Sequence, residues 1–140
     1  MLFGGHKIHH VCLPAEADLI NSEGFVVRLP VKGRKDAVVL DSRKLPGQVT
    51  AGGAAGVDPS KYDLVGLAMQ EPQYRSPGVR ELLDAVAKSR VPCMSIMNMP
   101  PLPYMKRIPG LNADSLKPAY TDPSVWDSFD PGKLTLCSPD

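Results

Sequence analysis

Long apolar runs are missing from this 140-residue sequence, and no heptad of apolar residues persists along it. A membrane-spanning helix needs roughly 18 or more consecutive apolar residues, so the sequence predicts neither a membrane span nor a coiled coil. Long helices are also disfavoured, because 15 prolines and 12 glycines interrupt the chain. The hydrophobic share of 43% and the charged share of 22% are typical of a soluble globular protein that buries a core.

Charge of one sign is not in excess, since 16 basic and 15 acidic residues give a net charge of +1. Without a basic stripe or an acidic tail, we expect neither nucleic acid nor a membrane as a partner. Cysteine is scarce, and Cys12, Cys93 and Cys137 lie far apart. An odd number of widely spaced cysteines argues against a disulfide framework and for a reducing compartment. The N-terminus resembles neither a signal peptide nor a transit peptide, so we expect a cytoplasmic protein.

Short elements separated by turns are predicted for the first half of the chain. Residues 8–13 read as a strand that ends at Pro14, and residues 14–21 read as a helix that begins with this proline. Two further apolar segments flank a basic loop and predict an antiparallel pair exposed on one face. These segments are residues 25–31 and 37–40, and a brief strand is predicted at 48–50.

A strand–helix–strand unit between about residues 62 and 98 is the strongest structural pattern. Residues 62–69 and 93–97 are nearly continuous apolar runs, as expected of strands covered on both faces. Between them, Ser76 and Pro77 predict the start of a helix over 79–90, whose apolar residues recur at helical spacing. Such a crossover places both strands parallel in one sheet, so the fold class is α/β.

Proline dominates the sequence after Pro100, where only residues 133–137 predict another strand, as a parallel or edge member of the sheet. We therefore expect a mostly parallel, partial Rossmann-like sheet in residues 1–100, with a short antiparallel pair, and a proline-rich extension in residues 101–140.

Ligands bind beyond the carboxyl ends of the strands in open parallel sheets, and this rule selects two segments. These segments, 69–72 and 98–101, each follow a predicted buried strand and end in proline. Asn98 can both donate and accept a hydrogen bond to a hydroxyl or carbonyl group of a ligand. The alternative is that Asn98 is a turn residue that bonds to its own backbone.

Other candidate sites have simpler explanations. His9 and His10 point to opposite faces of a strand, and with His6 they lack further ligands at metal spacing, so we expect no metal site. The glycine-rich segment 51–56 is followed by Val-Asp-Pro-Ser, which cannot open a crossover helix, and it reads as a loop. Cys93 lies within an apolar run, as a buried thiol does. Four methionines and a tyrosine could line an organic-ligand pocket, although core filling is the commoner use. They are Met94, Met97, Met99, Met105 and Tyr104.

The order of these segments resembles the N-terminal nucleotide-binding domain of the ketopantoate reductase family, which reduces 2-dehydropantoate with NADPH. The resemblance covers roughly residues 5–100. Asp63 and the apolar run up to Gln70 resemble the family's strand that ends in Ala-Val-Lys, and residues 95–98 resemble its strand that ends in Asn-Gly. The resemblance implies NADP as the cofactor, Ala68, Met69, Gln70 and Pro14 as cofactor-binding positions, and Asn98 as a catalytic residue.

Several family features are missing from this sequence. The family begins with a strand and a Gly-x-Gly-x-x-Gly turn, of which only Gly4-Gly5 resembles a remnant. Gln70 stands where the family has Lys, Pro14 where it has the Arg that favours a 2′-phosphate, and Met99 where it has Gly. The family's helical C-terminal domain, with its catalytic Lys and acidic residue, has no counterpart. We therefore expect a fragment or a divergent relative that is inactive by itself.

Two functional hypotheses follow from this reading. The first is a partial NADP-dependent oxidoreductase domain that binds the nucleotide and a 2-oxo acid. The second is a non-catalytic domain for a small ligand or a protein partner on an α/β scaffold. The missing first strand would leave a sheet edge open beside residues 8–13, and we expect a homo-oligomer or a second chain to cover it.

Overall fold

The computed structural model describes residues 1–96 and 99–137. Its contacts divide the chain into two compact units, which are residues 1–54 (unit 1) and residues 55–140 (unit 2). This division does not coincide with the predicted boundary at residue 100. The reason is the core of unit 2, which contains Leu83 and Val86 from before that boundary together with Trp126 and Leu134 from after it.

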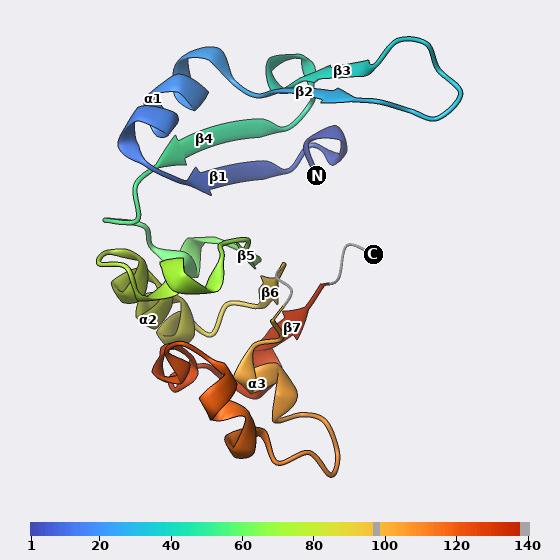
Figure 1. Cartoon of the computed structure of the whole chain (residues 1–140). Helices are drawn as coiled ribbons and strands as arrows, with labels where there is room; N and C mark the ends of the chain where they lie inside the picture. The colour runs from blue at the N-terminus through green and yellow to red at the C-terminus, as the bar shows by residue number, and fades with distance from the viewer. Residues whose placement is uncertain (97–98, 138–140) are drawn as a thin grey trace. The chain divides into compact units, whose positions relative to one another are not determined.

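Unit 1 contains a two-stranded parallel sheet and a separate hairpin (Figure 1). Its elements are β1 (Lys7–Val11), α1 (Pro14–Glu23), β2 (Val26–Leu29), β3 (Val38–Asp41) and β4 (Gln48–Gly52). The predicted strand at 8–13, helix at 14–21 and strand at 48–50 are thus confirmed within a few residues. Strand β1 pairs in parallel with β4, from Lys7 opposite Gln48 to Val11 opposite Gly52.

Local sequence explains both ends of α1. Pro14 is its first residue, and the Glu16 carboxylate accepts a hydrogen bond of 3.2 Å from the Leu13 N–H group. The helix ends at Glu23 because Gly24 adopts a φ of 74°, which disfavours residues with a side chain. The buried side chains Ala17 and Ile20 pack against Ala51 of β4. This core is small for a unit of its length.

The antiparallel pair β2–β3 is confirmed, but its exposure differs from the prediction. Val27 and Leu29 lie on one face of the hairpin and are 45% and 44% exposed. Val26 and Val39 lie on the other face and are 51% and 52% exposed. Both faces are therefore open, because the hairpin extends away from β1, β4 and α1 and no layer of unit 1 covers it (Figure 1).

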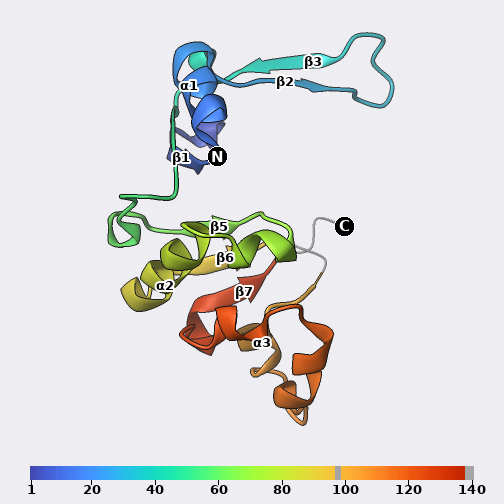
Figure 2. The same ribbon diagram turned by 60° about the vertical axis from the view of Figure 1, so that its left-hand side comes forward.

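Unit 2 is built on three parallel strands with β6 in the centre (Figure 2). Its elements are β5 (Val65–Leu67), α2 (Val79–Ser89), β6 (Cys93–Ser95), α3 (Leu102–Met105) and β7 (Leu134–Leu136). The predicted parallel arrangement of the strands on either side of α2 is confirmed. The predicted strand at 133–137 is also confirmed, as a parallel neighbour of β6.

The core of unit 2 lies between α2, the sheet and the segment after α3. Leu83, Val86 and Ala87 form the buried face of α2 and pack with residues from all three strands. Short 3-10 helices carry the chain between these elements. They include η4 (Glu71–Arg75), η5 (Ala113–Ala119), η6 (Pro123–Trp126) and η7 (Pro131–Lys133). Residues of the proline-rich segment thus contribute to the core of unit 2.

Two predicted boundaries in unit 2 need correction. Ser76 is not the N-cap of α2, because Gly78 holds that position with a φ of 79° and α2 begins at Val79. The Ser76 carbonyl instead accepts hydrogen bonds from the N–H groups of Val79 and Arg80. The first predicted strand is also shorter than residues 62–69. It includes only Val65–Leu67, and Leu64 is 44% exposed, so this strand is not covered along its whole length.

In the part of the chain that the structure describes, no helix is long and apolar enough to cross a membrane.

Candidate functional site at the carboxyl edge of the parallel sheet

The carboxyl ends of β5, β6 and β7 meet at one edge of the sheet in unit 2, because the three strands are parallel. Hydrogen bonds continue just beyond the strands. The Ile96 N–H group donates to the Leu67 carbonyl at 2.9 Å, and the Cys137 N–H group donates to the Ser95 carbonyl at 2.8 Å. We call this part of unit 2 the carboxyl edge. It is the place where open parallel sheets bind ligands.

The predicted positions Ala68, Met69 and Gln70 all follow β5 at the carboxyl edge. Ala68 and Gln70 are exposed, whereas Met69 is half-buried against the core of unit 2. Asn98, the predicted catalytic residue, lies outside the described residues. Pro14 belongs to unit 1, where it is the exposed first residue of α1. The structure therefore brings three of the five predicted residues together at one edge.

Gln70 occupies the N-cap position of η4, and its N–H group donates a hydrogen bond of 2.8 Å to the side-chain oxygen of Gln73. This contact fixes the direction in which the chain leaves the carboxyl edge. It also engages the Gln70 backbone N–H group.

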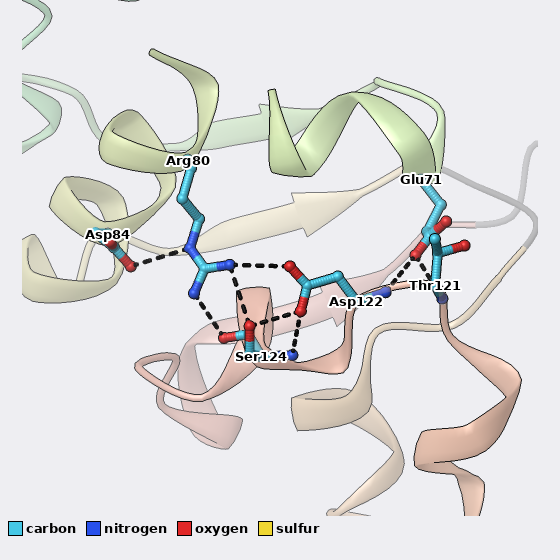
Figure 3. A network of polar contacts seen from close by, with 6 residues as sticks. All are labelled: Glu71, Arg80, Asp84, Thr121, Asp122 and Ser124. Carbon is cyan, nitrogen blue, oxygen red and sulfur yellow. Dashed lines mark hydrogen bonds and ion pairs between the residues drawn. The ribbon is translucent and has the colours of Figure 1, made fainter. Parts of the chain in front are cut away.

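Glu71 lies in the predicted segment 69–72, but sequence reasoning did not predict its contacts. One oxygen of its carboxylate accepts hydrogen bonds from the N–H groups of Thr121 at 2.9 Å and Asp122 at 3.3 Å (Figure 3). Two backbone donors satisfied by one carboxylate hold the segment at 121–122 beside the loop that leaves β5. Nothing in the local sequence indicates this contact, because the partners lie 50 and 51 residues away.

Arg80 of α2 also contacts the segment that Glu71 holds (Figure 3). Its guanidinium group lies 3.3 Å from the Asp122 carboxylate and also donates to the Ser124 carbonyl at 3.1 Å. It pairs with Asp84 one helical turn along α2 at 3.9 Å. The hydrogen bond from the Ser124 hydroxyl, together with the charge of Arg80, lowers the pKa of Asp122 below its ordinary value. These contacts tie α2 to the proline-rich segment.

Two buried side chains lie behind the carboxyl edge. Ser95 is the last residue of β6 and is fully buried, and Tyr74 of η4 is 1% exposed. Burial raises the pKa of Tyr74 to about 12, although a hydrogen bond with Ser95 opposes the shift. Burial also raises the pKa of the Cys93 thiol to about 11, so this thiol is not an activated nucleophile. The prediction that Cys93 is buried is confirmed.

These raised pKa values predict that unit 2 loses stability in alkaline solution. Folding favours the neutral forms of both groups. Their contribution to the free energy of unfolding is therefore complete at pH values below the ordinary pKa values, which are 9.0 for Cys93 and 10.0 for Tyr74. It should fall as the pH rises through the folded values of about 11 and about 12. Denaturant unfolding at a series of pH values measures this loss. The Tyr74→Phe variant should lose less stability over the upper part of the range, and an identical profile would refute the assignment.

The histidines of unit 1 have ordinary structural contacts. His9 Nδ1 lies 2.9 Å from the Thr50 hydroxyl oxygen, and the His10 ring meets the Phe25 ring edge-on at 5.5 Å. Within residues 1–96 and 99–137, no group of three or more His, Cys, Asp or Glu side chains could hold a metal ion.

No protein-family model matches this sequence, and no curated protein or solved structure matches it either.

Proposed function

We propose that this chain is a partial NADP-dependent oxidoreductase domain of ketopantoate-reductase type, with a partial Rossmann-like fold and no activity by itself. The order of the parallel strands is the observation that supports this proposal. A Rossmann sheet has the strand order 3-2-1-4-5-6 and binds the nucleotide at the carboxyl ends of its strands.

Under this proposal, the two parallel sheets would be two parts of this order. If β1, β4, β5, β6 and β7 are numbered 2 to 6 along the chain, the sheet of unit 1 reads 3-2 and the sheet of unit 2 reads 4-5-6. Every pairing in both sheets is parallel, as the fold requires. The hairpin β2–β3 is then an insertion between α1 and the third strand. Only the first strand, which carries the glycine-rich turn, has no counterpart among the described elements.

The described residues fit the cofactor only in part. Ala68, Met69 and Gln70 follow β5 at the carboxyl edge, and under this proposal they would contact the nucleotide. The position expected to hold the 2′-phosphate does not fit it, because Pro14 carries no charge and the Glu16 carboxylate lies nearby at the N-terminus of α1. A negative side chain at this position disfavours a 2′-phosphate. Reduction of a 2-oxo acid would therefore require groups other than these described residues.

Isothermal titration with NADPH and NADP tests the proposal. We expect weak binding, with heat that is detectable at about 1 mM cofactor. The Gln70→Ala variant should weaken this binding without lowering the melting temperature, because the Gln70 side chain is exposed. Lys88→Ala is the matched control, since Lys88 is an exposed residue in the last turn of α2, away from the carboxyl edge. No heat with either cofactor would contradict the proposal.

A second candidate is a non-catalytic domain that binds a small ligand or a protein, and one observation favours it. The proline-rich segment is held beside the loop after β5 by Glu71 and packs into the core through Trp126. These contacts make the carboxyl edge rigid, which suits a domain that binds a ligand or a protein without catalysis. Absence of heat with both cofactors, from a chain that is folded, would favour this candidate.

A further inference from the structure

One face of the β2–β3 hairpin consists only of aliphatic side chains. The strand register places Val27 opposite Leu40. It also places Leu29 opposite Val38, and side chains at opposite positions of these pairs share a face. The two residues of β2 are exposed and the two of β3 are half-buried. We call these four residues the hairpin face. A two-stranded hairpin is marginally stable without a covering layer, so this face gains stability from a partner.

Basic side chains occupy the loop at the tip of the same hairpin. Lys32, Arg34 and Lys35 are exposed, and none of them forms an ion pair within the part of the chain that the structure describes. A turn gathers them, because the Arg34 N–H group donates to the Val31 carbonyl at 3.0 Å and Gly33 adopts a φ of 86°. The hairpin therefore combines an aliphatic face with a cluster of positive charge. A surface of acidic and aliphatic side chains complements it.

The outer side of α1 has this complementary chemistry. The helix contains three acidic residues and no basic residue. Its buried side chains are Ala17 and Ile20, whereas Asp18, Leu19 and Glu23 are exposed. Leu19 is 54% exposed and lies between the two carboxylates on the helix surface, since residues four apart are neighbours. An exposed leucine with acidic neighbours matches the aliphatic and basic character of the hairpin.

The α1 helix of the same chain does not cover the hairpin face. The Phe25 N–H group donates to the Ser42 hydroxyl at 2.8 Å, and the Phe25 carbonyl accepts from the Ser42 N–H group at 2.8 Å. These two contacts fix the base of the hairpin. From this base, the hairpin extends away from α1 (Figure 1). An α1 helix that packs on the hairpin face must therefore come from another molecule.

We propose that two copies of this chain form a symmetric dimer, in which the α1 helix of each copy docks on the β2–β3 hairpin of the other. Leu19 packs on the hairpin face, and Asp18 and Glu23 pair with the basic loop. Around a two-fold axis this contact occurs twice, so two complementary patches are buried in a single association. The contact lies entirely within unit 1, and the inference does not depend on the proposed function.

Other partners fit the hairpin less well. Nucleic acid is contacted mainly through polar and cationic side chains, whereas the hairpin face is aliphatic. Insertion of the hairpin tip into a membrane would bury the charges of Lys32, Arg34 and Lys35, which is costly. A second copy supplies both an exposed leucine and the carboxylates.

Sedimentation velocity of the intact 140-residue chain tests the proposal. In low salt, we expect a monomer–dimer equilibrium with a dissociation constant on the order of 10–100 µM. The dimer should weaken by about fivefold or more when the salt is raised from about 50 mM to about 500 mM, because exposed charges are screened. A chain that stays monomeric up to about 1 mM in low salt would overturn the proposal. Assembly that continues beyond a dimer would also overturn it.

Charge-reversed variants examine the pairing itself. The loop variant carries Lys32→Glu, Arg34→Glu and Lys35→Glu. The helix variant carries Asp18→Lys and Glu23→Lys. Each variant alone brings like charges together, so we expect each to be a monomer at about 100 µM. In an equal mixture, both contacts again join opposite charges, and the two variants should form a heterodimer. A mixture of folded variants that stays monomeric refutes the proposed contact.

Leu19→Ser examines the apolar part of the contact. Loss of the leucine side chain from a buried contact should weaken the dimer by about tenfold. Leu64→Ser is the matched control, because Leu64 is an exposed leucine of unit 2 with an exposed fraction of 44%. We expect the control to dimerise like the unmodified chain. Equal dissociation constants for the two variants would show that Leu19 lies outside the interface, which contradicts the inference.

Further outcomes separate this inference from the alternatives. A chain that dimerises as described but gives no heat with NADPH refutes the oxidoreductase proposal and keeps the dimer. A chain that binds NADPH but stays monomeric has the opposite meaning. Binding of a monomeric chain to phosphatidylserine vesicles, lost in the loop variant, would assign the hairpin to a membrane surface and overturn the dimer.

Discussion

The Trp126→Ala variant should lose about 3–5 kcal/mol of the free energy of unfolding of unit 2, which is enough to unfold a marginally stable domain. Trp126 is 2% exposed and lies between two other aromatic rings. Its ring centroid is 5.2 Å from that of Tyr74 and 5.6 Å from that of Phe129. Truncation to alanine would leave a cavity that α2 and the sheet cannot fill without moving. Denaturant unfolding followed by circular dichroism measures the loss.

Trp126→Phe is the control for this prediction. The indole Nε1 group of Trp126 is buried and finds no hydrogen-bond partner among the described residues. Replacement by phenylalanine keeps an aromatic ring and removes an unsatisfied donor, so we expect a loss of only about 1–2 kcal/mol. Equal losses in the two variants would show that Nε1 makes a hydrogen bond on which unit 2 depends. They would contradict our account of this core.

The Asn21→Ala variant should destabilise unit 1 by about 2 kcal/mol, because it removes both hydrogen bonds to Ala51. Ala51 is 9% exposed, so its backbone groups would be poorly compensated by water. Unit 1 buries few side chains, and a loss of this size is a large part of its stability. Hydrogen exchange of the Ala51 amide measures the effect directly.

Asn21→Asp separates the two hydrogen bonds of this contact. Aspartate can still accept from the Ala51 N–H group, but it cannot donate to the Ala51 carbonyl and brings a negative charge near it. We expect an intermediate loss of protection at the Ala51 amide. Unchanged exchange in both variants would show that Asn21 does not stabilise the edge of β4.

Local patterns made the parallel unit of β5, α2 and β6 predictable from the sequence. Val79, Leu82, Leu83 and Val86 recur at helical spacing, and apolar runs stand on either side of them. The start of α2 was less predictable, because Ser76 and Pro77 resemble a helix start. The positive φ of Gly78 delays that start to Val79. A glycine so close to a proposed N-cap is the feature that could have indicated it.

Contacts between distant residues could not be predicted in the same way. The pairing of β1 with β4 joins residues 41 positions apart, and Asn21 reaches Ala51 across 30 positions. Neither contact has a local sequence pattern. For the site, the sequence predicted where Ala68, Met69 and Gln70 lie but not that Glu71 fastens the segment at 121–122. A single sequence lists charged residues without indicating which of them meet.

The most direct test of the central claim is a titration of the isotope-labelled chain with NADPH, followed through its backbone amide resonances. If the chain is part of a dinucleotide-binding domain, the largest shifts should fall on Ala68, Met69 and Gln70, and Gln70→Ala should reduce them. The Lys88→Ala control should leave them unchanged. Shifts that are absent at millimolar cofactor, or that gather at the other end of the strands, would contradict the account.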